Sequence, residues 1–450
     1  MPTALSDLRR IDRDHHLHPF THHPDMEKSG GTHIITAGEG CWLHDAEGRK
    51  LLDGLAGLWC VNVGYGRQEI ADAVHEQMKK LPYYCSFFNS TTEPAILLAD
   101  LLAKHAPKRL GHTIFSNSGS EANESALKLI RGYWKIRGRS SKNQKILART
   151  FAYHGVGIAS TSLTGLPSCY APFDLPLQGF IHVPGPYAYG ANNGMNDQQY
   201  GQWCLEETRR IIEREGPDTI GAMFVEPIQG AGGVIVPPDG YLRDLRALCR
   251  QYDILFVADE VISGFGRLGD WFASNLWQLD PDVITMAKGI TSGYLPLGAT
   301  MVSHDMRDAL NSGGYLAHGF TYSGHPATCA CAIANIQIIE REQLVQRTRD
   351  DAGPYFQRKL RELSGHPAVG EVRGHQLIGA IELLPRGGRA ELVKTPNTLG
   401  VKAANIARRH GVIVRGIRDL IAMSPPLTIT HDETDFLFSA VRKTLDELWT

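Results

Sequence analysis

The sequence predicts an α/β fold, with a large domain built on a mostly parallel sheet and a smaller α+β domain. Short apolar runs rich in β-branched residues alternate with helical stretches between residues 112 and 302. Strands separated by helices need crossover connections, which produce a mostly parallel sheet with helices on both faces. Several of these runs are apolar throughout, which is typical of buried parallel strands. The predicted strands are His112–Phe115, Lys145–Ala148, Ala222–Val225, Ile254–Ala258, Val283–Met286 and Ala299–Val302.

Two regions of different composition flank this alternation. Residues 33–55 carry turn signals at Gly38–Gly40 and Glu47–Gly48, which predict a short antiparallel meander. After a helix-like run that follows His325, the chain combines helices with short strands and closes with an amphipathic helix from Asp432. The predicted domains are residues 1–59 as an N-terminal arm and part of the small domain, 60–335 as the large domain, and 336–450 as the C-terminal small domain.

Composition and charge argue against several classes of function. The 450 residues carry a net charge of −2 and no basic run, which gives no electrostatic basis for binding nucleic acid or an anionic membrane. No apolar stretch reaches membrane-spanning length, and the N-terminus lacks the apolar core of a secretory signal. The eight cysteines are scattered without a CxxC pair, so we expect no disulfide framework and a reducing cytoplasm as the location.

The N-terminal segment is crowded with histidines, namely His15, His16, His18, His22 and His23. Histidine is a common metal ligand, so a metal site in this segment is one interpretation. No carboxylate or cysteine falls at a spacing typical of metal ligands. We therefore expect a solvated or packed arm, and we predict no metal site.

Two of the buried runs are followed by residues that apolar packing would not select. Asp259 follows the run 254–258, and Lys288 comes just after 283–286. Ligands of open α/β sheets bind at the carboxyl ends of the strands, so the acid and the amine could share one site. Pyridoxal phosphate chemistry needs such a pair: a lysine amine forms a Schiff base with the cofactor aldehyde, and a carboxylate keeps the pyridine nitrogen protonated. A buried ion pair is the alternative interpretation.

The segment Ser116–Glu124, SNSGSEANE, follows a predicted strand and opens a predicted helix. Small residues at a helix N-terminus let backbone N–H groups approach an anion, so Gly119 and Ser120 are candidates for binding a phosphate. An ordinary helix cap explains the same residues.

Further candidates follow other predicted strands. Tyr153 comes soon after the strand at 145–148 and could stack on a planar cofactor, with His154 beside it. Glu226 follows the strand at 222–225 and could orient the cofactor or Asp259, although a structural turn fits it equally. Arg415 ends the strand at 412–414 and suits bidentate recognition of a carboxylate, unless it forms a structural salt bridge. Arg418 and Arg267 are the alternatives to Arg415 for that role.

In combination, these segments resemble the class III, fold-type I pyridoxal phosphate aminotransferases, in particular the amine or ω-amino acid:pyruvate transaminases. The resemblance covers essentially the whole chain, and the order and spacing of the motifs are more specific than any one motif. The motifs are DGLAGLWCVNVGYGR (53–67), SGSEANE (118–124), YHG (153–155), EPIQGAGGVIVPP (226–238), ADEVISGFGR (258–267), AKGITSGY (287–294), HGFTYSGHP (318–326) and SPPL (424–427) with the Arg415 region.

The resemblance implies a mostly parallel seven-stranded sheet, pyridoxal 5′-phosphate as cofactor and a role for each matching residue. Lys288 would be the catalytic lysine that forms the Schiff base, and Asp259 would hold the pyridine nitrogen. Thr321 would reach the cofactor phosphate from the neighbouring subunit, so an active homodimer, possibly paired into a tetramer, is expected. The remaining cofactor-binding residues would be Gly119 and Ser120 at the phosphate, Tyr153 and Val261 on the ring faces, and His154 and Glu226 close to Asp259.

The resemblance also implies a substrate pocket. Ornithine- and GABA-type relatives carry a glutamate in the EPIQG loop, where this sequence has Ala231, and that difference favours pyruvate over 2-oxoglutarate as acceptor. Arg418 differs from the residue expected in close amine:pyruvate relatives, and its charge would favour a donor with a distal acidic group. The pocket residues would be Trp59, Phe87, Phe88, Tyr153, Ala231 and Arg415.

The predicted function is therefore transfer of an amino group from a primary amine or ω-amino acid, such as β-alanine, to pyruvate by a ping-pong mechanism. Decarboxylating transaminases and aminomutases share Lys288 and Asp259, so these reaction types are alternatives. An NAD(P) oxidoreductase is a third, but Gly64-x-Gly66 lacks the third glycine of a dinucleotide fingerprint.

Overall fold

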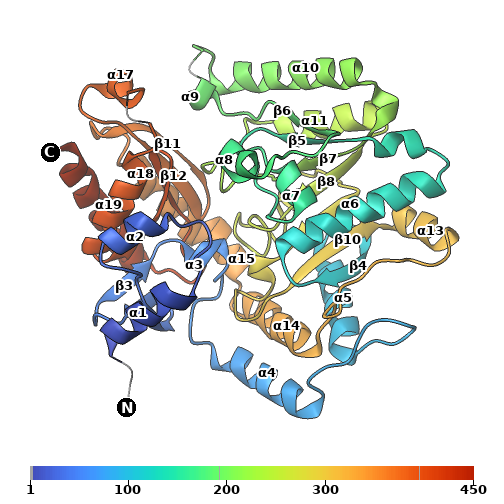
Figure 1. Cartoon of the computed structure of the whole chain (residues 1–450), viewed down its shortest axis with the longest axis horizontal. Coiled ribbons are helices and arrows are strands. Elements are labelled where there is room, and N and C mark those ends of the chain that lie inside the picture. Colours follow the sequence, from blue (N-terminus) through green and yellow to red (C-terminus); the bar gives the residue numbers. More distant parts are fainter. Residues whose placement is uncertain (1–3, 192, 395) are drawn as a thin grey trace.

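A seven-stranded sheet forms the centre of the computed structural model, which describes residues 4–191, 193–394 and 396–450 (Figure 1). The strand order is β4-β10-β9-β8-β7-β5-β6, and only β10 runs antiparallel to its two neighbours. The mostly parallel sheet predicted from the sequence is thus confirmed. The strands are β4 (Leu110–Ser116), β5 (Lys145–Arg149), β6 (Phe180–Val183), β7 (Ile220–Val225), β8 (Leu255–Asp259), β9 (Val283–Met286) and β10 (Gly298–Ser303).

The sequence identified six of these strands individually and missed β6. This strand lies at the edge of the sheet and pairs only with β5. Three of its four residues are only partly buried, and one of them is His182. Strand β6 therefore lacks the continuous apolar run that marks the central strands.

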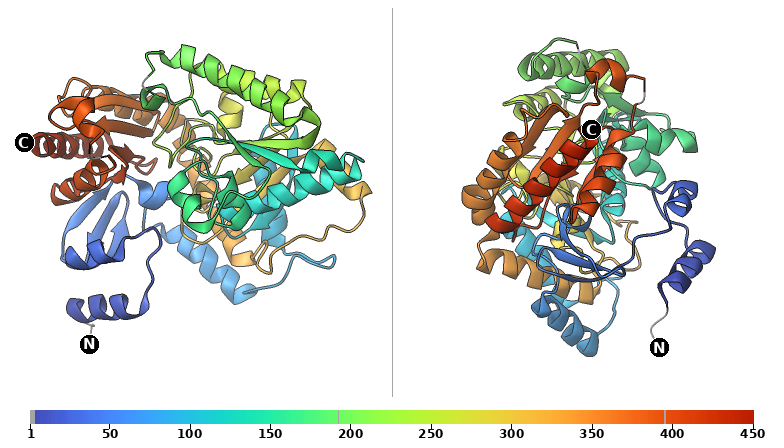
Figure 2. Two further views of the ribbon diagram at one scale, coloured as in Figure 1. Left: turned by 45° about the horizontal axis from the view of Figure 1, so that its top comes forward. Right: turned by 90° about the vertical axis from the view of Figure 1, so that its left-hand side faces the viewer.

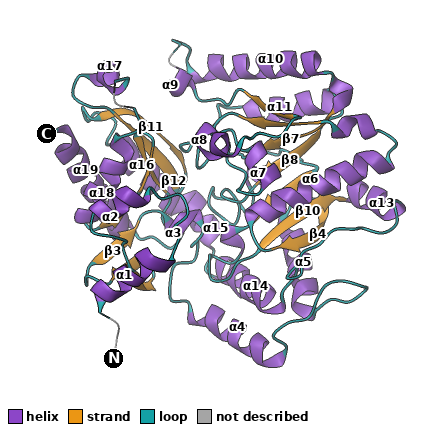
Figure 3. Ribbon diagram, in the orientation of Figure 1, coloured by secondary structure: helices purple, strands orange, loops and turns teal. Residues whose placement is uncertain are grey.

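Helices cover both faces of this sheet, because successive strand residues point to opposite sides (Figure 3). Phe224 of β7 packs in one cluster with Trp134 of α6, whereas Met223 packs in the opposite cluster with Leu245 of α11. The helices of this region are α4 (Gln68–Lys80), α5 (Glu93–His105), α6 (Gly119–Ile136), α7 (Ile158–Leu163), α8 (Pro167–Tyr170), α9 (Ala188–Ala191), α10 (Asp197–Glu215), α11 (Tyr241–Gln251), α12 (Ala273–Leu276), α13 (His304–Ser312) and α14 (Pro326–Arg341).

The C-terminal region forms a smaller α+β layer structure around an antiparallel sheet of order β11-β12-β15-β14. Helix α18 packs against both β14 and the closing helix α19. The elements are β11 (Val369–His375), β12 (Ile378–Leu383), β14 (Arg415–Ile417), β15 (Leu420–Met423), α15 (Leu344–Arg347), α16 (Gly353–Arg361), α17 (Gly388–Leu392), α18 (Leu399–Arg409) and α19 (His431–Trp449).

The N-terminal segment joins this smaller region through a second sheet, of order β1-β2-β3-β13. Strand β13 (Val412–Ile413) pairs parallel with β3, so Leu52 lies opposite Val412. The N-terminal strands consequently lie against C-terminal elements in both views of Figure 2. The domain boundaries at 59/60 and 335/336 stay predictions, and α14 crosses the second of them. The remaining elements are β1 (Ile35–Glu39), β2 (Trp42–Asp45), β3 (Lys50–Asp53), α1 (Leu5–His15), α2 (His23–Lys28) and α3 (Ala56–Trp59).

Two properties of the chain complete the description. All eight cysteines carry free thiols. Among the residues that the structure describes, no helix combines the length and the apolar character needed to cross a lipid bilayer.

The pairing of β3 with β13 gives a testable expectation for stability. Leu52 is fully buried there, so Leu52→Ala should leave a cavity and lower the free energy of unfolding by about 2–5 kcal/mol. Ile35 of β1 is 41% exposed, and Ile35→Ala should change that free energy by less than about 0.5 kcal/mol. Thermal unfolding followed by circular dichroism compares the two variants. Equal shifts would contradict the burial of β3 against the C-terminal strand.

Candidate active site

A cavity of about 440 Å³ lies where the parallel strands end. Asp259 is the last residue of β8, Glu226 directly follows β7, and Lys288 comes two residues after β9. Because parallel strands present their carboxyl ends at one edge, residues far apart in the sequence meet there. Eight of the predicted site residues line this single cavity: Gly119, Ser120, Tyr153, His154, Glu226, Asp259, Val261 and Lys288.

Lys288 opens a short 3-10 turn, Lys288–Ile290, with a φ of 50°. A positive φ is uncommon for a residue with a side chain, and such strain concentrates at functional sites. Within the described structure, the amine forms no hydrogen bond or ion pair. Burial lowers its pKa; the nearby Cys60, Asp259 and Glu226 oppose this shift, and Arg415 adds to it. The amine is therefore more readily deprotonated than that of an exposed lysine.

Three donors fix the carboxylate of Asp259. The Nδ1 atom of His154 lies 2.7 Å from its Oδ2, and the side-chain amide of Asn123 donates to the same oxygen at 2.8 Å. The backbone N–H of Val261 donates to Oδ1 at 3.2 Å. A carboxylate oxygen accepts more than one hydrogen bond, so Oδ1 retains capacity for a ligand.

Asn123 is a functional residue that the sequence analysis did not single out. Its amide also donates to the backbone oxygen of His154 at 2.7 Å, so it holds His154 and Asp259 together. The residue lies one helical turn after Gly119 on α6, and residues four apart share a helix face. The period of α6 is the signal that would have identified it.

Glu226 orients the backbone around the cavity. It accepts hydrogen bonds from the N–H groups of Tyr153 at 2.8 Å and Gly230 at 3.0 Å. Burial raises its pKa; the charge of Asp259 adds to that shift, while His154 and the two backbone donors oppose it. Glu226 thus ties Tyr153 to the loop that carries Ala231.

The N-terminus of α6 forms the polar end of the cavity. Ser118 caps this 18-residue helix by accepting the N–H of Glu121 at 3.2 Å, and Gly119 and Ser120 occupy its first turn. A Cβ atom on Gly119 would lie only 3.1 Å from a Val261 methyl group, and one on Gly155 would lie 2.6 Å from the Ser120 hydroxyl oxygen. Capping by Ser118 does not prevent anion binding at the same helix end. The cap accepts the N–H of Glu121, and the other first backbone N–H groups of a helix have no partner within it.

Arg415 and Lys288 face the same indole ring. The Arg415 guanidinium carbon lies 5.1 Å and the Lys288 nitrogen 5.4 Å from the centre of the Trp59 ring. Among the described residues, none accepts a hydrogen bond from the buried Nε of Arg415. Burial lowers the pKa of Arg415, since the charged form loses hydration. A half-buried cation without a carboxylate partner is a receptor for an anionic ligand.

The other two candidate arginines already have protein acceptors. Arg267 is fully buried and donates to the side chain of Asn62 at 3.0 Å and the backbone oxygen of Leu377 at 3.2 Å. Arg418 donates to the backbone oxygen of Gly232 at 2.7 Å, next to Ala231. These contacts leave Arg415 as the best-placed carboxylate receptor of the three.

Comparison with known proteins places this geometry in a family. The family model for class-III aminotransferases matches residues 26–445. The chain belongs to the class-III aminotransferase family. It is 42% identical to the putrescine–pyruvate aminotransferase of Pseudomonas aeruginosa over 98% of this chain and 96% of that protein.

Solved structures agree with this assignment. The (S)-enantioselective omega-transaminase from Thermomicrobium roseum has a TM-score of 0.95 and 41% identity, with 100% of both chains covered. The omega-transaminase from Pseudomonas jessenii, solved in complex with PMP, has a TM-score of 0.94 and 37% identity over 99% of this chain and 98% of that one. The protein is a transaminase, and the fold expected from the resemblance is confirmed.

Phe87, Phe88 and Thr321 do not line the cavity of Lys288 within one chain of this transaminase. Phe87 and Phe88 line a separate cavity of about 750 Å³, and the Phe88 side chain is 81% exposed. The Tyr83 hydroxyl donates to the backbone oxygen of Thr321 at 2.7 Å, and the Phe87 ring lies against Gly319, two residues before Thr321.

The N-terminal arm contributes an aromatic residue that the sequence analysis overlooked. The ring of Phe20 lies 6.5 Å from that of Tyr153 in an edge-on arrangement, and 73% of Phe20 is exposed. An aromatic residue in a histidine-rich segment gives no local signal of this contact, which arises only when the arm folds over the large region.

The shifted pKa of Lys288 predicts a pH-dependent stability. In the unfolded chain the amine stays protonated up to its ordinary pKa of 10.5, whereas the buried amine loses its proton at lower pH. Stability should therefore rise with pH across that window. Lys288→Met should stabilise the cofactor-free protein most at pH values below the lowered pKa of the amine, with the gain shrinking as pH approaches 10.5.

Thermal unfolding across pH measures this difference. Lys104→Met serves as the matched control, because the Lys104 side chain is 64% exposed and should give no comparable trend. A gain for Lys288→Met that is the same at every pH would show that the buried amine is not the cause.

Proposed function

We propose that this transaminase moves an amino group from a primary amine or ω-amino acid to pyruvate in two successive half-reactions. The observation that carries the proposal is that the amine of Lys288 and the guanidinium of Arg415 lie near the same Trp59 ring. Within the described residues, the buried Nε of Arg415 has no hydrogen-bond acceptor. The amine suits amino transfer and the guanidinium suits the carboxylate of a keto acid. The relative named as a putrescine–pyruvate aminotransferase supports the same substrates.

Class-III aminotransferases use pyridoxal 5′-phosphate, and the residues of the cavity fit this cofactor. The backbone of Gly119 and Ser120 would hold the phosphate at the positive end of α6. Asp259 would hold the ring nitrogen, with Tyr153 and Val261 on the two ring faces and Lys288 at the aldehyde end. The missing Cβ of Gly119 lets the Val261 side chain pack close against the first turn of α6.

When bound, the cofactor supplies a carbonyl group for the incoming amine and an electron-withdrawing ring. Asp259 would favour a proton on the ring nitrogen through its carboxylate charge, and His154 and Asn123 hold that carboxylate in place. Lys288 would be the base that takes the proton from the donor carbon onto its Nζ and passes it to the cofactor carbon, and its lowered pKa suits that role. Glu226 keeps Tyr153 in position through the backbone.

The acceptor end of the site is built around Arg415. Ala231 lies in the loop held by Glu226 and Arg418, and its methyl side chain offers no carboxylate to neutralise a nearby arginine. Arg415 is thereby available to the small carboxylate of pyruvate. Arg418 already donates to Gly232, so it acts chiefly to hold this loop rather than to select an acidic donor.

The active form is a homodimer. Phe87, Phe88 and Thr321 would complete the site of the neighbouring subunit, with Thr321 at the phosphate. Large apolar side chains are exposed around these residues, including Tyr84, Tyr315 and Leu316, and a partner subunit would cover them.

The proposed function is tested by the absorption spectrum of the purified holoenzyme. Putrescine or β-alanine should abolish the visible absorption of the bound cofactor, and pyruvate should restore it with formation of one alanine per active site. Lys288→Ala should fail to complete the cycle, with a rate loss of at least about 10³-fold. Carbon dioxide or a rearranged amine formed without a keto acid would instead indicate a decarboxylating enzyme or an aminomutase. A preference for 2-oxoglutarate would contradict the acceptor assignment.

The role of Arg415 gives a separate expectation. Arg415→Ala should raise KM for pyruvate by about 10- to 100-fold, since charged hydrogen bonds contribute about 1.5–3 kcal/mol. The half-reaction with putrescine, which has no carboxylate, should change only a few-fold. Stopped-flow measurement of each half-reaction separates the two effects. Arg361→Ala, at an exposed position on α16, is the control, and an equal loss in both half-reactions would contradict the carboxylate role.

A further inference from the structure

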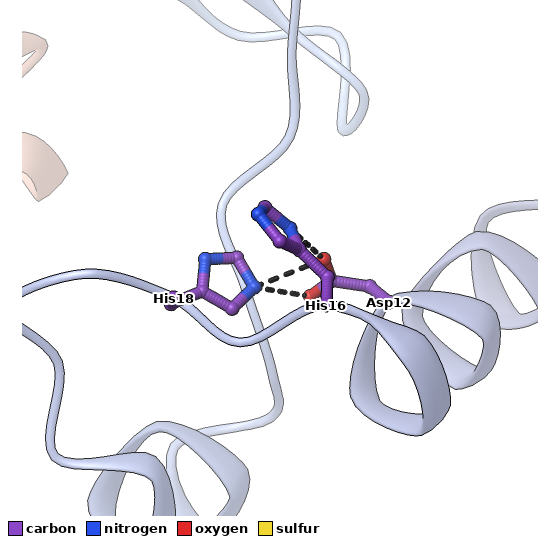
Figure 4. A group of neighbouring side chains, drawn as sticks. All are labelled: Asp12, His16 and His18. Atoms are coloured by element: carbon purple, nitrogen blue, oxygen red, sulfur yellow. Dashed lines mark hydrogen bonds and ion pairs between the residues drawn. The ribbon is translucent and has the colours of Figure 1, made fainter.

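Three side chains of the N-terminal arm converge outside the active site. Asp12 lies on α1, His16 directly follows that helix, and His18 lies two residues further on. In Figure 4 both imidazole rings point toward the carboxylate of Asp12. No carboxylate at metal-ligand spacing and no metal site were predicted from the sequence, although Asp12 and His16 are four residues apart and so lie on the same side of the helical turn.

The donor atoms are already arranged as metal ligands. Nδ1 of His16 lies 3.0 Å from Oδ1 of Asp12, and Nε2 of His18 lies 2.9 Å from both carboxylate oxygens. One ligand atom from each residue falls within 4.8 Å of the other two. Metal–ligand bonds of about 2.0–2.2 Å at tetrahedral angles place neighbouring ligand atoms about 3.3 Å apart, so the two distances between imidazole and carboxylate need to lengthen by only a few tenths of an ångström.

We propose that Asp12, His16 and His18 bind a divalent transition metal ion, with Zn²⁺ as the best match. Two imidazoles and one carboxylate suit a borderline metal and leave one tetrahedral position for water. The side chains of Asp12 and His18 are each only 18% exposed, whereas that of His16 is 61% exposed, so an ion can enter from the His16 side. This proposal does not rest on the proposed transaminase function.

The position of the site suggests what the metal does. The backbone N–H of His18 donates to Nε2 of His23 at 3.1 Å, which fixes the segment between α1 and α2. Phe20, two residues after His18, lies against Tyr153 at the cavity. A metal bound by Asp12, His16 and His18 ties α1 to the segment that carries Phe20, and so holds the arm in place beside the active site.

Metal binding is measured on tag-free, chelator-treated holoenzyme by calorimetry with Zn²⁺ and by the visible absorption of Co²⁺. One ion per chain should bind, and Asp12→Asn, His16→Ala or His18→Ala should each weaken binding by at least about tenfold.

His15→Ala is the matched control, since His15 is the adjacent exposed histidine and lies outside the cluster. It should bind Zn²⁺ as the wild type does. Equal weakening in His15→Ala and His16→Ala, or no saturable binding by the wild type, would overturn the proposal and leave the three residues as a hydrogen-bonded group. Retained transaminase activity in each variant shows that it has folded.

Limited proteolysis tests the tie between α1 and the following segment. Trypsin can cut after Arg9, Arg10 and Arg13 of α1. Zn²⁺ should slow this cleavage several-fold in the wild type and in His15→Ala, but leave it unchanged in His16→Ala. Cleavage that Zn²⁺ slows equally in His16→Ala, or does not slow in the wild type, would contradict a structural role for the ion.

Discussion

The common direction of β5, β7, β8 and β9 is the constraint on which the site depends. Their carboxyl ends lie along one edge, so the residues that follow them are brought together without any long side chain having to reach across the fold. The apolar layers on both faces hold that edge in place. The site residues can then depart from ordinary backbone geometry, as Lys288 does with its positive φ, because packing around them prevents relaxation.

Buried charge is distributed unevenly around this edge. Asp259 and Glu226 have hydrogen-bond donors from several segments, so their burial is compensated within the protein. Lys288 and Arg415 lack such compensation in the described part of the chain, and burial lowers the pKa of both. Groups whose burial the fold leaves uncompensated are the ones that a cofactor and a carboxylate substrate would satisfy. Asp259 and Glu226, which have protein partners, therefore position the site, whereas Lys288 and Arg415 are the residues left to interact with ligands.

The substrate end of the site is assembled from a different part of the molecule. Arg415 belongs to the small sheet, and Trp59 belongs to the N-terminal segment that pairs with β13. Arg373 donates to the backbone oxygen of Gly233 at 2.9 Å, and Arg418 donates to that of Gly232. The loop around Ala231 is thus anchored to the smaller region, and the position of that region decides how the carboxylate receptor meets Lys288.

The sequence by itself determined the α/β class, six of seven central strands and the pair Asp259 and Lys288, because buried strands leave a strong apolar signal and the strand-end residues interrupt it. It also ranked Arg415 above Arg267 and Arg418, but only as a preference. Which arginine lacks a protein acceptor depends on contacts with Asn62 and Gly232, which are distant in sequence.

Only the tertiary structure decided the rest. The edge strand β6, the hydrogen bonds of Asn123 to His154 and Asp259, and the contact of Phe20 with Tyr153 all depend on packing between segments. Local sequence patterns indicate whether a residue is buried and whether apolar residues recur with the period of a helix or of a strand. They do not record which distant side chain will lie beside it, because that is fixed by the path of the whole chain.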